Sequence, residues 1–153
     1  ALTHGTPVLT ETVAIITWLA ERYPEKALIP AAGSDARGEY YRWLCFALHL
    51  EYAAIDRKRA IENSEEVRVT IGYGDFDTAF ATLKARLQDR AHIVGDHFTA
   101  LDLYYSGLLQ WFIQRAQVLP ADSVYLDYMN RHLARPAHQR AVALDEALLA
   151  EMG

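Results

Sequence analysis

Three polar residues near the N-terminus, Thr10, Glu11 and Thr12, stand directly before an apolar stretch with helical spacing. Threonine hydroxyls accept hydrogen bonds from the free N–H groups of a first helical turn, so Thr10 or Thr12 is a candidate helix cap. A carboxylate and hydroxyls at the positive end of a helix are also suited to holding a polar ligand. The local pattern leaves both roles open.

A second polar pair lies in the stretch "GDHFTALDLYY", where Thr99 and Asp102 have the spacing of a helix capping box. In this arrangement the Thr99 hydroxyl accepts from the Asp102 N–H, and the Asp102 carboxylate accepts from the Thr99 N–H. Phe98 and Leu103 stand where a hydrophobic staple would secure the same helix start. We therefore predict a structural role for Asp102 and no role as a catalytic acid.

Other residue patterns with chemical potential are weak. The histidines form neither HxxxH nor HExxH, and they have no acidic partner at ligand spacing, so no metal site is predicted. No serine stands in GxSxG, and "GYGDFD" has too few glycines for a phosphate loop. The single cysteine, Cys45, lies in the apolar run "RWLCFALHL", and we expect it to be buried and unreactive. The six histidines are His4, His49, His92, His97, His132 and His138.

The elements that position these residues are predicted to be helices, because apolar side chains recur at steps of three and four. Asp35 is a candidate N-cap for the longest of them, and the helix after Thr99 is apolar nearly all round and is expected to be buried. Residues 1–9 suit a loop or a hairpin, and no span predicts an internal sheet. The expected helices cover about 12–22, 36–62, a stretch beginning at Gly74 or Asp75, a stretch after Thr99, 122–133 and 136–150.

Composition narrows the class of protein further. A chain of 153 residues and 17.3 kDa is large enough for one domain with its own core. The net charge is -5 and the basic residues are scattered, which argues against a nucleic-acid partner. Charges interrupt every apolar stretch well before the roughly 20 residues that a bilayer requires. With a single cysteine, the sequence predicts a cytoplasmic protein that does not enter a membrane.

Four segments, in this order and spacing, resemble the glutathione transferase family and particularly its bacterial members. They are "LTETVAIITWLAERYP", "GSDARGEYYRWLCFALHLEYAAIDR", "IVGDHFTALD" and "RPAHQRA". The resemblance implies an all-α fold, in which residues 36–153 form the helical bundle of that family's C-terminal domain. Residues 25–35 would be a linker, and residues 1–24 a hairpin and the last helix of a thioredoxin-like domain.

The resemblance also implies the roles of individual residues. Glu11 and Thr12 would meet the γ-glutamyl end of glutathione, with the carboxylate accepting from the ligand ammonium and the helix start holding its carboxylate. Thr12 stands where serine is usual in the family. Tyr52 and Trp111 are candidates for the pocket of an apolar electrophile, although Tyr52 and Cys45 depart from the residues typical of the beta class. Glutathione would be a co-substrate, no other cofactor is implied, and a homodimer is expected.

One part of the family pattern has no counterpart in the sequence. The family's strand–helix–strand unit, with the Ser, Cys or Tyr that supports the ionised glutathione sulfur, is not expected within residues 1–153, so the catalytic residue is unknown. We accordingly expect the chain alone to conjugate glutathione no faster than background. The alternative functions are a non-catalytic helical interaction module and a protein that holds apolar ligands between its helices.

Overall fold

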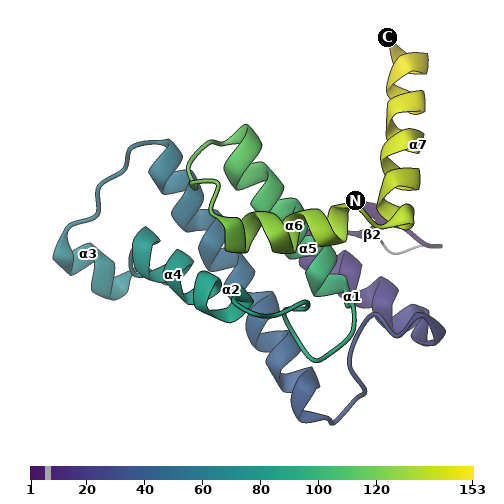
Figure 1. Cartoon of the computed structure of the whole chain (residues 1–153), viewed down its shortest axis with the longest axis horizontal. Coiled ribbons are helices and arrows are strands. Elements are labelled where there is room, and N and C mark those ends of the chain that lie inside the picture. The colour runs from purple at the N-terminus through teal and green to yellow at the C-terminus, as the bar shows by residue number, and fades with distance from the viewer. Residues whose placement is uncertain (6–7) are drawn as a thin grey trace.

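The structure is a computed structural model that describes residues 1–5 and 8–153 (Figure 1). The regular secondary structure of this part of the chain is almost entirely helical. The exception is a short antiparallel hairpin of β1 (Leu2–Thr3) and β2 (Val8–Leu9), in which Leu2 pairs with Leu9. The predicted all-α class with a hairpin at the N-terminus is therefore confirmed.

Four helices pack around the hydrophobic core: α2 (Asp35–Lys58), α4 (Phe76–Leu87), α5 (Ala100–Gln110) and α6 (Ser123–Leu133). Each contributes apolar side chains at steps of three and four to one buried face, as amphipathic helices do. Helix α5 contacts both α2 and α6, which makes it the central element of the bundle. Fully buried side chains from these helices include Tyr40, Leu50, Leu83, Leu101, Tyr105, Leu109, Tyr128 and Met129.

The central helix is held at its start and widened at its end. The predicted capping box of Thr99 and Asp102 is present, with the Asp102 carboxylate accepting the Thr99 N–H at 2.8 Å. After Gln110 the helix continues as a π-helical turn, Trp111–Arg115, in which the Ala116 N–H donates to the Trp111 carbonyl at 2.8 Å. Such turns often lie at functional sites.

Two predicted helix caps require correction, although α1 has the expected bounds. Helix α1 spans Thr12–Arg22, but its N-cap is Glu11, which makes no side-chain capping bond, so neither Thr10 nor Thr12 caps it. Helix α2 is capped by Ser34, whose hydroxyl accepts the Arg37 N–H at 3.2 Å, and not by Asp35. It ends at Lys58, four residues earlier than expected.

One helix was not predicted, and one stands apart from the bundle. The short α3 (Glu65–Thr70), capped by Ser64, lies within a region expected to be irregular. The C-terminal α7 (Pro136–Met152) begins with proline at its first position, as predicted, and buries none of its residues. Figure 1 shows α7 projecting away from the bundle with the C-terminus at its far end. Among the described residues, no helix is both long and apolar enough to cross a membrane.

Candidate functional site

A pocket of about 320 Å³ lies where the start of α1 meets α2 and α5. Its walls come from residues far apart in the sequence, which only the tertiary fold brings together. Two of the four predicted glutathione-site and electrophile-pocket residues, Thr12 and Trp111, are among them. The complete lining is Thr12, Glu51, Ile55, Tyr104, Leu108 and Trp111. We refer to it below as the α1–α2–α5 pocket.

Helical spacing places the lining side chains of α2 and of α5 each on one face of the helix. Glu51 and Ile55 are four residues apart on α2, so they lie on the same face of that helix. Tyr104 and Leu108 have the same relation on α5, and Trp111 follows three residues later at the start of the π-helical turn. Two adjacent helix faces therefore supply five of the six lining residues.

The polar part of the pocket is a hydrogen-bonded pair, in which the Tyr104 hydroxyl donates to Glu51 Oε1. Burial raises the pKa of Tyr104 well above its ordinary value, and the hydrogen bond to Glu51 and the charges of Glu51 and Glu11 raise it further. The phenol consequently stays protonated at neutral pH and acts as a hydrogen-bond donor. It is not suited to act as a base in this state.

The residues at the start of α1 differ in their placement. Thr12 is the first residue of the helix and lines the pocket, whereas Glu11 is exposed and is not among the lining residues. Glu11 has φ 65° and ψ 120°, a conformation that non-glycine residues rarely adopt. Because its side chain makes no capping bond, the first-turn N–H groups of α1 remain available to an anionic group.

The two predicted electrophile-pocket residues, Trp111 and Tyr52, differ in whether they line the pocket. Trp111 is 37% exposed and forms one wall of the pocket. Tyr52 is 65% exposed on the neighbouring face of α2, and it does not line the pocket. Cys45 is exposed as well, so the expectation that it is buried was wrong. The apolar neighbours of Cys45 in the sequence point to other sides of the helix.

Sequence reasoning missed Glu51 and Tyr104 as pocket residues. Each belongs to a helix that was predicted, but their pairing joins positions 53 residues apart. A polar residue within an otherwise apolar helix face could have marked each of them as unusual. It does not show which other helix that residue contacts.

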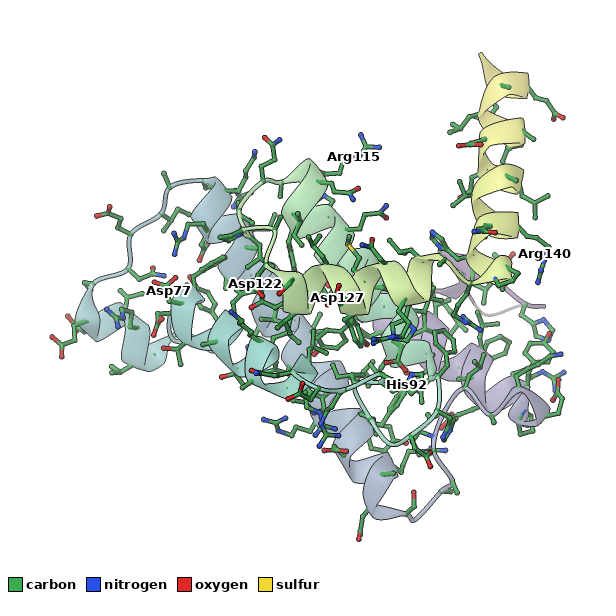
Figure 2. The ribbon with its side chains drawn as sticks, viewed as in Figure 1. Asp77, His92, Arg115, Asp122, Asp127 and Arg140 are labelled. Atoms are coloured by element: carbon green, nitrogen blue, oxygen red, sulfur yellow. The ribbon has the colours of Figure 1, made fainter. Side chains whose placement is uncertain are left out.

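The structure also gathers three residues that no sequence motif connects: His92, Asp102 and His132, whose ligand atoms all lie within 4.8 Å of one another. His92 comes from the connection between α4 and α5 and is labelled in Figure 2. Its Nδ1 lies 3.7 Å from Asp102 Oδ2, and His132 Nε2 lies 3.7 Å from Asp102 Oδ1. The arrangement raises the question of a metal site.

The donor set fits a metal poorly. The fully buried Asp102 carboxylate accepts from the Ile93 N–H (2.8 Å), the Tyr128 hydroxyl (2.7 Å) and both the N–H and the hydroxyl of Thr99 (2.8 and 3.1 Å). These four bonds occupy the roughly four lone-pair sites of a carboxylate. His132 Nε2 lies 2.9 Å from the Ala91 carbonyl, so it carries a proton and offers no lone pair. We interpret the cluster as a structural network.

A larger cavity of about 530 Å³ lies between α2, α3 and α4, away from the predicted site residues. Several of its polar groups already have partners within the protein. Arg57 pairs with Asp77 at 3.0 Å, and the Tyr73 hydroxyl donates to Asp56 at 2.5 Å. This pairing leaves the cavity with less to offer a ligand than the α1–α2–α5 pocket.

The family described as "Glutathione S-transferase, C-terminal domain" matches residues 52–135, which is more than half of the chain. The chain belongs to the glutathione S-transferase family. Tyr104, Trp111 and the Thr99–Asp102 capping box fall within the matched range. Thr12 and Glu51 lie before it.

Individual relatives in the family are bacterial. The glutathione S-transferase GstA of Escherichia coli O157:H7 is 27% identical over 147 residues, which cover 94% of this chain and 71% of GstA. A glutathione transferase from Methylococcus capsulatus is 26% identical with a TM-score of 0.72, covering 91% of this chain and 68% of that one. A sphingomonad glutathione S-transferase complexed with glutathione is 27% identical with a TM-score of 0.70, covering 95% and 72%.

These likenesses confirm the predicted fold. The helical bundle is that of the C-terminal domain of a bacterial-type glutathione S-transferase, preceded by a small two-stranded hairpin and α1. The domain boundaries at residues 24 and 36, and the roles of the individual site residues, stay predictions.

Proposed function

We propose that the chain binds the two substrates of glutathione-dependent transfer to an apolar electrophile. In this reaction the glutathione thiolate attacks an electrophilic carbon, a carbon–sulfur bond forms and the leaving group departs with its electron pair. Membership of the family supports glutathione as the co-substrate. One observation locates the proposed binding site: Thr12, at the start of α1, lines the same pocket as Trp111.

In this proposal, Glu11 and Thr12 bind the γ-glutamyl end of glutathione. The open first turn of α1 and the Thr12 hydroxyl hold the ligand carboxylate, and the Glu11 carboxylate accepts from the ligand ammonium. The electrophile lies against Trp111, whose indole offers a large apolar surface. Tyr52 is too exposed to form a wall of this pocket, so any contact it makes with the electrophile comes from outside it. The residue that supports the thiolate is not assigned.

The binding of glutathione to the chain tests this proposal directly. Thr12→Val keeps the size of the side chain and removes the hydroxyl, so it should weaken glutathione binding about tenfold, the effect of losing one hydrogen bond to a charged group. Thr10→Val makes the same change two residues earlier, outside the pocket, and should leave the affinity unchanged. Isothermal titration calorimetry measures both.

A truncated ligand tests whether α1 binds the γ-glutamyl residue of glutathione. Cysteinylglycine lacks the γ-glutamyl residue that Glu11 and Thr12 are proposed to bind, so it should bind far more weakly than glutathione. If it binds as tightly, or if the two threonine variants lose affinity equally, α1 does not form the γ-glutamyl site.

We also propose that the protein is a cytoplasmic homodimer. Four exposed residues of α2, Tyr41, Cys45, Leu48 and Tyr52, follow each other at steps of four, three and four along one helix face. We call these residues the α2 stripe. Exposed apolar stripes of this kind favour association, and a two-fold axis would bring the same stripe of two copies together.

A ligand-holding function is the second candidate, and the composition of the α1–α2–α5 pocket favours it. Ile55, Leu108 and Trp111 form the apolar part of an open pocket, against which an aromatic molecule would bind without any reaction. The two functions differ in their dependence on glutathione. A carrier binds the aromatic ligand equally well with and without glutathione, whereas a transferase site shows coupling between the two ligands.

A further inference from the structure

We propose that Glu51, held by Tyr104, makes the α1–α2–α5 pocket selective for neutral or cationic aromatic molecules that carry a hydrogen-bond donor, and that it disfavours aromatic carboxylates. The inference deepens the proposed function, on which it rests, because it names the class of electrophile that the pocket accepts. It concerns the binding of the aromatic ligand alone.

The apolar side of the pocket sets the size and shape of the ligand. Ile55 from α2 and Leu108 from α5 line the pocket, and Trp111 adds a flat aromatic wall. A volume of about 320 Å³ is at the lower end of the range for small-molecule pockets. An aromatic body of one or two rings, packed against the indole, suits this space.

Apart from the start of α1, which the proposed function assigns to the γ-glutamyl carboxylate, the polar side of the pocket carries the negative charge of Glu51. None of the six lining residues is basic, and within the described part of the chain no basic side chain lies within 4.0 Å of the Glu51 carboxylate. Lys58, two turns further along α2, is held by the Ala116 carbonyl at 2.8 Å. The charge of Glu11 also reaches Tyr104 and adds to the negative potential.

The Tyr104–Glu51 hydrogen bond fixes the position of the charge. Because the phenol donates to Oε1, the carboxylate keeps lone pairs that accept a hydroxyl, amide or ammonium N–H from a ligand. The half-buried position of both residues strengthens such a bond relative to one in open water. A ligand that presents a second carboxylate to this place meets repulsion instead.

A matched pair of probes isolates the charge of the ligand. Naphthalene-2-carboxamide and naphthalene-2-carboxylate have the same ring and nearly the same size, but only the amide is neutral and offers N–H donors. We expect the amide to bind about tenfold more tightly, which is the size of effect that two like charges a few ångströms apart produce after solvent screening. Chemical shifts of the Trp111 indole N–H, assigned with a Trp111→Phe variant, measure both affinities.

Glu51→Gln is the decisive variant, because it removes the charge and keeps the shape of the side chain. It should bring the two affinities to within about twofold of each other. Glu65→Gln removes the same charge from α3, which Figure 1 shows at the other end of the bundle from α1, and it should leave the ratio unchanged. Raising the ionic strength from about 0.05 M to about 1 M should also reduce the ratio in the unaltered protein.

Three outcomes overturn the inference: equal binding of the two probes, a ratio that Glu51→Gln does not change, or binding of neither probe at millimolar concentration. Circular dichroism of Glu51→Gln verifies that a changed ratio reflects the site and not a loss of fold. The measurements need no glutathione. If the probe ratio behaves as expected and glutathione does not bind, the selectivity stands and the transferase proposal fails.

Discussion

At the scale of single residues, Asp102 shows how much one buried carboxylate can organise. It caps α5 through Thr99, fixes the connection before α5 through the Ile93 N–H and holds α6 through the Tyr128 hydroxyl. The spacing of threonine and aspartate in the sequence predicted the first of these roles. The other two depend on residues that the fold brings to the carboxylate, and no local pattern indicates them.

His132 is the neighbour of Asp102 for which a pH effect is expected. Its pKa is lowered from the ordinary value, chiefly because burial disfavours the charged form, while Asp102 and the Ala91 carbonyl act in the opposite direction. The nearby positive or titratable groups, His92 and Arg131, lower it further.

From this lowered pKa follows a loss of stability in acid. The unfolded chain, in which histidine titrates near about pH 6.5, takes up protons before the folded protein does. The stability that His132 supports is therefore present above that pH and is lost as the pH falls below it. His132→Gln, which keeps a donor for the Ala91 carbonyl, should flatten the decline in the free energy of unfolding between about pH 7.5 and 5.5.

Urea denaturation at a series of pH values measures this slope. His97 lies in the same connection, but its side chain is half exposed and pairs only with the exposed Asp96. His97→Gln should therefore follow the unaltered protein. A slope that His132→Gln leaves unchanged would show that burial of this imidazole has no linkage to folding.

At the scale of helices, the sequence predicted most elements because their caps and apolar periods agree. Asp75, one of the two expected starts, caps α4 through the Thr78 N–H at 2.8 Å, and Pro136 begins α7 as expected. The six-residue α3 was not predicted because it is too short to show a helical repeat of apolar residues, although Ser64 provides its cap. The start of α1 at Thr12 was predicted, but its cap was not, because Glu11 takes an unusual backbone conformation that a sequence pattern does not reveal.

The candidate site was less predictable than the helices that carry it. Thr12 and Trp111 came from the family resemblance, and the structure places both in one pocket. Glu51 and Tyr104 complete that pocket because α2 and α5 pack at one particular rotation. Such a rotation is a property of tertiary packing, so periodicity within either helix does not specify it.

Two glycines, Gly107 and Gly74, differ in backbone conformation, so the same substitution should affect stability in opposite directions. Gly107 lies inside α5, where an added Cβ meets nothing within 4 Å, so Gly107→Ala should stabilise the protein by about 0.5–1 kcal/mol. Gly74 has φ +71° just before α4, a conformation that strains other residues. Gly74→Ala should destabilise the protein by about 1 kcal/mol.

The two substitutions are chemically identical and serve as controls for each other in urea denaturation. Opposite signs are expected, because only the backbone conformation differs between the sites. Destabilisation by both would mean that α5 has no room for the added methyl group.

At the scale of the whole molecule, the α2 stripe leads to a prediction about assembly. A charge placed in a self-associating apolar surface meets its own symmetry mate, so Leu48→Lys should weaken the homodimer at least about tenfold. Leu144→Lys makes the same change on the exposed α7 and should leave association as it was. Sedimentation velocity over a range of concentrations measures both variants, and a clean monomer of the unaltered protein at high concentration would refute the dimer.

The projecting α7 is expected to unfold locally before the helical bundle does. A helix that buries none of its residues is not tied to the cooperative core, so it can unwind while the bundle stays folded. Its amide hydrogens should exchange with solvent deuterium early, whereas those of α5 should wait for the whole bundle to open. In this respect one chain holds two thermodynamic units, and their division falls at the short turn between Leu133 and Pro136.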